Sequence, residues 1–160
     1  LQSVAISLGS NDFVSVLEAY EPDKAKAAHV TRCVFEAAGK MAFSEFAAIK
    51  GMRDWLGVPG ELNDGRVLGG LIEVELQAML VRYTVAAFDE KEVIIDINKD
   101  DLERGGLGYD MSLITTAYLS LWYGMAKTLV SAQWFVWREM EDVPENIVRV
   151  KIAKKIDKYC

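Results

Sequence analysis

The chain contains few of the residues on which common catalytic and metal sites are built. Its 160 residues include two cysteines, one histidine and three prolines. Cys33 and Cys160 form no C-x-x-C pair, so the sequence predicts neither a zinc site nor a disulfide framework. We therefore expect a protein that folds without a metal or a cofactor. So sparse a use of cysteine is typical of a reducing, cytoplasmic compartment.

The chain also lacks an excess of basic residues and a long apolar run. Lysine and arginine number 18 against 24 acidic residues, which gives a net charge of −6. Proteins that bind nucleic acids or anionic membrane surfaces need a basic face, so neither partner is expected. Residues 113–130 form the most apolar segment, but they include polar residues that disfavour a bilayer-spanning helix: Thr115, Thr116, Ser120, Tyr123 and Lys127. The N-terminus has no basic stretch before an apolar run, so no secretory signal is expected.

Length and composition predict one domain over residues 1–160. Hydrophobic residues make up 51% of the chain and charged residues 26%, a balance typical of globular proteins. The pattern of apolar residues divides this domain into three parts. Residues 1–79 are predicted to be mainly helical, residues 80–153 to form a hairpin, a helix and a second hairpin, and residues 154–160 to form a charged tail.

A long helix is predicted over residues 23–50. Apolar residues recur along it at helical spacing and predict its buried face: Val30, Val34, Ala37, Ala38 and Met41. Arg32, Glu36 and Lys40 are spaced four residues apart and predict a charge ladder on a solvated face. Gly39 interrupts the helix at a cost of about 1 kcal/mol, which indicates that another segment crosses closely at this position.

Two shorter segments complete the helical part. Asn11 and Asp12 are candidate caps for a short first helix. Residues 67–79 fit either of two structures, because they place apolar side chains on one side of a helix and also alternate over residues 71–76 as a strand would. The length of the segment favours the helix. Glycine, proline and asparagine in residues 51–66 predict the main loop.

The second part predicts two antiparallel hairpins. Residues 80–88 and 92–97 are rich in β-forming residues and alternate apolar with polar side chains. Residues 132–140 and 147–153 form the second pair of strands in the same way. The polar stretch at residues 98–110 contains three glycines and is predicted to be a loop.

One apolar helix, residues 112–130, lies between the hairpins and has only a narrow polar stripe. The fold predicted from these elements is α+β, with N-terminal helices and this buried helix packed on an antiparallel sheet of two hairpins. The strand at residues 132–140 is apolar on both faces. Two such apolar elements side by side indicate a cavity or a subunit interface, and we expect a homodimer.

The element order of residues 80–153 resembles that of the 4-vinyl reductase domain superfamily. This group includes the transport protein particle subunits and the 2-amino-thiazoline-4-carboxylate hydrolase-like family. The similar features are a strand that ends in Asp96, Ile97 and Asn98, a glycine-bearing loop, a helix that carries Gly124, and a terminal hairpin. The cysteines that often occur in the 4-vinyl reductase domain have no counterpart at those places, so no metal site is carried over. The resemblance implies a small dimeric module that holds an apolar or aromatic compound between helices and sheet.

Five residues are candidates for binding a ligand: Trp122, Trp134, Trp137, Arg138 and His29. Aromatic walls with one guanidinium suit a flat or carboxylate-bearing compound, because the rings supply contact area and the guanidinium supplies orientation. The alternative is that the tryptophans belong to the core or to a dimer interface and that Arg138 pairs with a neighbouring acid.

Two further pairs of residues are candidates for sites of chemistry. Cys33 lies one turn after His29, and a Cys–His pair can activate a thiolate. Residues four apart on a helix point the same way, so we expect neither side chain to orient the other and Cys33 to pack in the core. Glu73 and Glu75 could act together on a strand, but on a helix residues two apart diverge.

Two classes of function remain open. The first is a small-molecule binding or sensing domain that uses an apolar cavity between the last helix and the sheet. The second is a small cofactor-free hydrolase or lyase with its active site in the same cavity, and a non-catalytic assembly subunit is a third possibility. Convergence of Arg138, an acid and His29 in one cavity would favour the enzyme, whereas an apolar lining would favour binding.

Overall fold

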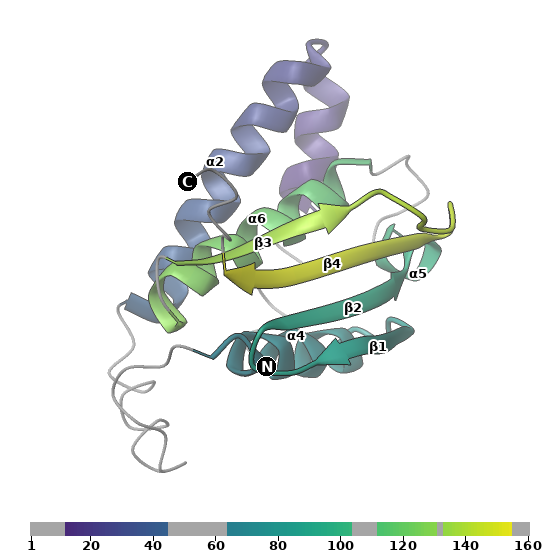
Figure 1. Ribbon diagram of the computed structural model, residues 1–160. Helices are drawn as coiled ribbons and strands as arrows, with labels where there is room; N and C mark the ends of the chain where they lie inside the picture. The colour runs from purple at the N-terminus through teal and green to yellow at the C-terminus, as the bar shows by residue number, and fades with distance from the viewer. Residues whose placement is uncertain (1–11, 45–63, 104–111, 131–132, 155–160) are drawn as a thin grey trace, which may run out of the picture.

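The computed structural model describes residues 12–44, 64–103, 112–130 and 133–154 (Figure 1). A helix over residues 12–20 comes first. The remaining elements, in chain order, are α2 (Lys24–Ser44), α4 (Arg66–Ala78), β1 (Tyr83–Phe88), β2 (Glu92–Asn98), α5 (Lys99–Glu103), α6 (Ser112–Leu129), β3 (Trp134–Glu139) and β4 (Ile147–Lys154). The α+β class predicted from the sequence is confirmed.

The four strands form one antiparallel sheet in the order β1-β2-β4-β3. The two predicted hairpins are therefore joined through their second strands, with Ile95 opposite Val150 at the centre. The register of β1 shifts between Val85 and Ala87, so one residue bulges out of this edge strand. The prediction that residues 67–79 are helical is also confirmed, because they form most of α4.

The sheet buries one of its faces. Alternate residues of the two central strands have no exposed surface: Val93, Ile95, Ile97, Val148, Val150 and Ile152. Figure 1 shows α6 and α4 behind this face, and no described helix over the opposite one. The space between α6 and the sheet is filled by the core, which includes Trp122 and Trp134. The face toward the viewer in Figure 1 is therefore the open side of the sheet.

Helices α2 and α6 cross in backbone contact at two glycines. A Cβ on Gly39 would lie 2.9 Å from the amide nitrogen of Met125 and closer still to the carbonyl oxygen of Leu121. A Cβ on Gly124 would lie 3.0 Å from the amide nitrogen of Lys40. The close crossing predicted at Gly39 is confirmed.

The face of α2 that is buried differs from the predicted one. Ala27, Thr31 and Phe35 are buried, whereas Val34 is 42% exposed and Met41 is 56% exposed. The glycine crossing explains the difference, because Gly39 must face α6 and this fixes the rotation of α2 about its axis. The rotation also carries Cys33 to the surface, so its predicted place in the core is wrong.

The prediction of a loop over residues 98–110 is wrong at its beginning, where α5 occupies Lys99–Glu103. The side chain of Asn98 accepts a hydrogen bond from the backbone N–H of Asp101 at 3.0 Å and thereby caps the helix. Two aspartates in the first turn of α5 favour the helix electrostatically. The predicted continuation of α2 to residue 50, most of the main loop and the C-terminal tail lie outside the described residues.

Candidate functional site

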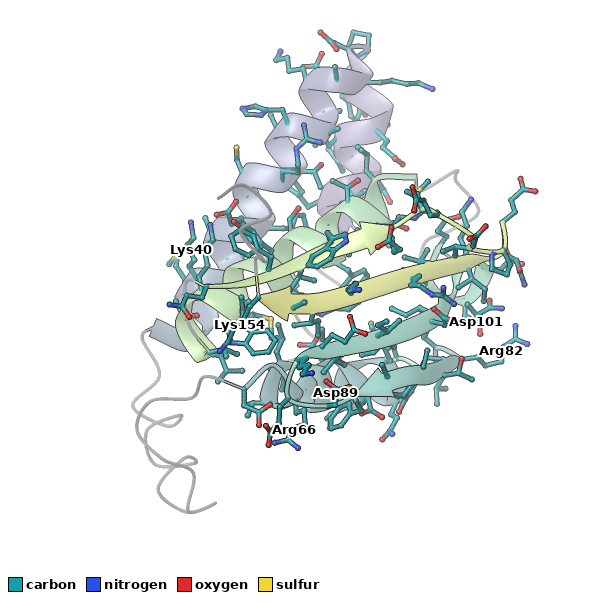
Figure 2. The ribbon with its side chains drawn as sticks, in the orientation of Figure 1. Lys40, Arg66, Arg82, Asp89, Asp101 and Lys154 are labelled. Atoms are coloured by element: carbon teal, nitrogen blue, oxygen red, sulfur yellow. The ribbon has the colours of Figure 1, made fainter. Side chains whose placement is uncertain are left out.

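A groove of about 900 Å³ lies on the open side of the sheet. The turn between β1 and β2, the start of β2, the middle of β3 and the end of β4 form its walls. Ten residues line it: Asp89, Glu90, Lys91, Glu92, Phe135, Val136, Trp137, Lys151, Ala153 and Lys154. Figure 2 places Lys154 and Asp89 at one end of the sheet and Asp101 with Arg82 at the other. The groove is thus a feature of one end of the molecule.

Two aromatic rings supply most of the apolar surface of the groove. Phe135 and Trp137 alternate with buried residues along β3, so both side chains project from the open side. The ring of Phe135 is held by Tyr123 of α6, with 5.9 Å between ring centroids. The ammonium of Lys151 lies 6.0 Å from the centroid of the Trp137 indole. Both rings are half-buried and leave surface for a flat molecule.

The carboxylates of the groove already have partners. The Asp89 carboxylate accepts hydrogen bonds from the backbone N–H groups of Glu92 at 3.0 Å and Lys91 at 2.7 Å, and these bonds hold the pKa of Asp89 below its ordinary value. Glu92 forms an ion pair with Lys151 at 2.7 Å. Glu90 lies 3.8 Å from a guanidinium nitrogen of Arg66. No carboxylate of the groove is therefore left as an isolated charge.

Two lysines at the same end of the sheet are not neutralised in this way. Neither Lys91 nor Lys154 forms an ion pair with any described residue. The ammonium of Lys154 lies 5.5 Å from the centroid of the Trp134 ring, which favours the cation without neutralising it. Asp64, which Lys154 influences electrostatically, is bound by the guanidinium of Arg66 at 2.6 Å. The groove therefore offers two ammonium groups that no described carboxylate holds in an ion pair.

The structure does not bring the five predicted site residues together. Trp137 lines the groove, but Trp122 and Trp134 are fully buried on the other side of the sheet. Trp122 donates a hydrogen bond from Nε1 to a carboxylate oxygen of Glu75 at 2.7 Å. His29 is exposed on α2, with its Nε2 3.7 Å from Sγ of Cys33. The predicted convergence of aromatic walls and a guanidinium does not occur.

Arg138 follows Trp137 on β3 and so projects from the opposite side of the sheet. Its Nε is buried and has no hydrogen-bond partner among the described residues. The alternative, in which Arg138 pairs with Glu139, Glu141 or an acid of the neighbouring strand, is not observed among the described residues either. A buried guanidinium nitrogen without an acceptor is an energetic liability that either a ligand or a substitution could relieve.

The two glutamates of α4 diverge, as the helical alternative predicts. Glu73 accepts a hydrogen bond from the hydroxyl of Tyr83 at 3.1 Å, whereas Glu75 contacts Trp122. Burial raises the pKa of Glu75 above its ordinary value, and the bond from the indole N–H opposes this effect only in part. These carboxylates do not form a catalytic or metal-binding pair.

Sequence reasoning missed Phe135, Lys151 and Lys154 as candidates for the groove. The signal for the first two was present, because the alternation of the last two strands placed Phe135 beside Trp137 and Lys151 beside Arg149 on the polar face. What the sequence did not contain was the register of the second hairpin and the pairing of β4 with β2. The register places Lys151 opposite Trp137, and the pairing with β2 places Glu92 opposite Ala153.

Comparison of the sequence with protein-family models and with curated proteins finds no match. Within the described ranges, no three or more histidine, cysteine, aspartate or glutamate side chains gather as a metal site would require. No helix of that part of the chain has both the length and the apolar character needed to cross a bilayer.

Proposed function

We propose that this protein binds a small aromatic or apolar molecule that bears a carboxylate, and that the groove on the open side of the sheet is the binding site. The observation that carries the proposal is the combination, in one groove of about 900 Å³, of two half-buried aromatic rings with two lysines that form no ion pair with a described residue. A ring of the ligand would lie on Phe135 and Trp137. Its carboxylate would lie toward Lys154 or Lys91.

Binding or sensing fits this groove better than the alternative of a cofactor-free hydrolase or lyase. General acid–base catalysis needs a titratable group that is free to exchange a proton with the substrate. Asp89, Glu90 and Glu92 are each engaged by a backbone N–H or a cation, and His29 is on α2. The groove therefore offers contact area and charge in place of a proton-transfer group.

The observed order of helices, hairpin, helix and hairpin also agrees with the element order on which the resemblance to the 4-vinyl reductase domain superfamily rests. Membership of that superfamily stays a proposal. The site proposed here differs from the one that the resemblance implies, because it lies on the open side of the sheet and not between α6 and the sheet.

Affinity measurements on a matched set of ligands test the proposal. Naphthoate or indole acetate would be compared with the corresponding neutral amide by titration calorimetry. The Lys154→Met variant should weaken binding of the acid by about 1 kcal/mol, the usual value for a partly solvated charge pair, and leave the amide unaffected. Arg138→Met is the matched control, because Arg138 lies on the other side of the sheet. If Arg138→Met abolishes binding and Lys154→Met does not, the groove is not the site.

We also propose a homodimer. Ten large hydrophobic side chains of the described residues are exposed, and five of them belong to residues 12–44: Phe13, Val16, Tyr20, Val34 and Met41. Figure 1 shows the helix over residues 12–20 and α2 side by side, extending beyond the sheet. Apolar surface concentrated in this way is typical of subunit contacts. Sedimentation at micromolar concentration should give the mass of two chains, and a monomer would refute this proposal.

A further inference from the structure

The only histidine of the chain contacts one of its two cysteines. Sγ of Cys33 lies 3.7 Å from Nε2 of His29 on α2, within the range of a hydrogen bond that involves sulfur. Both side chains are exposed, and Cys33 is a free thiol. The thiolate is the nucleophilic form of cysteine, and an adjacent imidazole can accept the proton of the thiol. The contact thus places a nucleophile beside a base on an accessible helix face.

Among the described charged residues within one turn of this pair, one cation forms no ion pair. Glu36, within one turn of Cys33, has its carboxylate bound by two lysine ammonium groups at 2.7 and 2.9 Å. Lys26, one turn before His29, forms an ion pair at 2.7 Å with an acid outside α2. Arg32 is exposed and forms no ion pair with the described part of the chain. Arg32 lies three residues after His29, on the same side of α2, so its guanidinium is available to an anionic reagent at the pair.

We infer that His29 and Cys33 form a thiol modification site for low-molecular-weight disulfides that carry carboxylates, a class that glutathione disulfide represents. The thiol of Cys33 transfers its proton to Nε2 of His29, and the thiolate attacks one sulfur of the disulfide. The original S–S bond breaks as the new one forms, and the departing thiolate takes the proton from the imidazolium. The reagent is itself the oxidant, so no further reactant is needed. Arg32 would bind a carboxylate of the reagent.

Reaction rates of single-thiol variants test this inference. In a Cys160→Ser background, Cys33 is the only thiol of the chain. Rates at pH 7 would be measured with glutathione disulfide and with the uncharged reagent iodoacetamide, and mass spectrometry would locate the adduct. We expect one glutathione per chain on Cys33. His29→Gln should slow both reagents several-fold, because it removes the base that accepts the proton of the thiol during the attack.

Two charge variants on the same helix separate the role of Arg32 from a general effect of charge. Arg32→Gln should slow glutathione disulfide about threefold and leave iodoacetamide unchanged, since only the former is anionic. Lys24→Gln, which removes an exposed charge more than a turn before His29, should change neither rate. All three positions are exposed, so circular dichroism should show an unchanged fold.

Equal rates for the parent and His29→Gln with both reagents would overturn the inference. An adduct that fails to form on Cys33 under conditions in which free cysteine is fully converted would do the same. An Arg32→Gln variant that slows both reagents equally would show that the site does not select anionic disulfides.

Discussion

The contact between α2 and α6 depends on two residues that have no side chain. At Gly39 a methyl group would need to lie 2.9 Å from the Met125 amide nitrogen, whereas ordinary van der Waals contact begins at 3.4 Å. The helices would have to separate by at least half an ångström, and by more where the Leu121 carbonyl oxygen approaches. A gap of that size forfeits a quarter to a half of the dispersion energy across the contact. We expect Gly39→Ala to destabilise the fold by roughly 2–4 kcal/mol, although alanine gains about 1 kcal/mol in helix propensity.

Urea unfolding of matched glycine variants measures this effect. Gly70 is the control, because it lies within α4 and a methyl group there meets no atom within 4 Å. Gly70→Ala should therefore stabilise the protein by about 0.5–1 kcal/mol. Gly124→Ala should destabilise it as Gly39→Ala does, and the double variant should fall short of the sum because both act on one contact. A Gly39→Ala variant as stable as Gly70→Ala would refute the backbone crossing.

Two further predictions concern buried polar groups. Burial raises the pKa of Glu75 in the folded protein above its value in the unfolded chain. The folded state is therefore favoured most at a pH below the unfolded-state pKa, where Glu75 is protonated, and this stabilisation is lost as the pH rises through the folded-state pKa. Glu75→Gln should therefore stabilise the fold by roughly 1 kcal/mol at pH 7 and have little effect near pH 4, and a benefit confined to acid pH in thermal melts would contradict this. Arg138→Met removes a buried Nε that has no described partner and should leave stability unchanged or raise it by up to about 1 kcal/mol. The control is Arg149→Met, which breaks two hydrogen bonds of 2.6 and 2.7 Å to Asp96 and should destabilise the fold by about 1–2 kcal/mol in the same melts.

The sequence predicted the elements well because their signals are local. Alternation identifies the four strands, and the apolar pattern of residues 112–130 identifies α6 as the helix behind the sheet. Gly39 also predicted a close crossing, because a glycine inside a helix lowers its stability and is expected only where a neighbouring segment leaves no room for a side chain. The rotation of α2 could not be predicted, because Val34 and Met41 carry as strong an apolar signal as the residues that are buried. The partner of Gly39, not the hydrophobicity of α2, decides which face is covered.

The candidate site was predicted only in part for a similar reason. Trp137 was identified, and its side of β3 follows from alternation. The sequence does not show that β4 lies between β2 and β3, and that order brings Lys151 and Glu92 to the same groove. Nor does it show that Trp122 and Trp134 lie in the core, because the sequence does not distinguish a tryptophan of the core from a tryptophan that lines a pocket. Long-range strand order is therefore the missing information.

The most direct test of the groove is to follow the indole N–H signals of the four tryptophans by NMR while an aromatic carboxylate is added. Variants with each tryptophan changed to phenylalanine would assign the signals. If the ligand lies on the open side of the sheet, the Trp137 signal should shift, and the signal of the fully buried Trp122 should stay in place. A shift of the Trp122 signal with an unchanged Trp137 signal would contradict the account and place the ligand between α6 and the sheet.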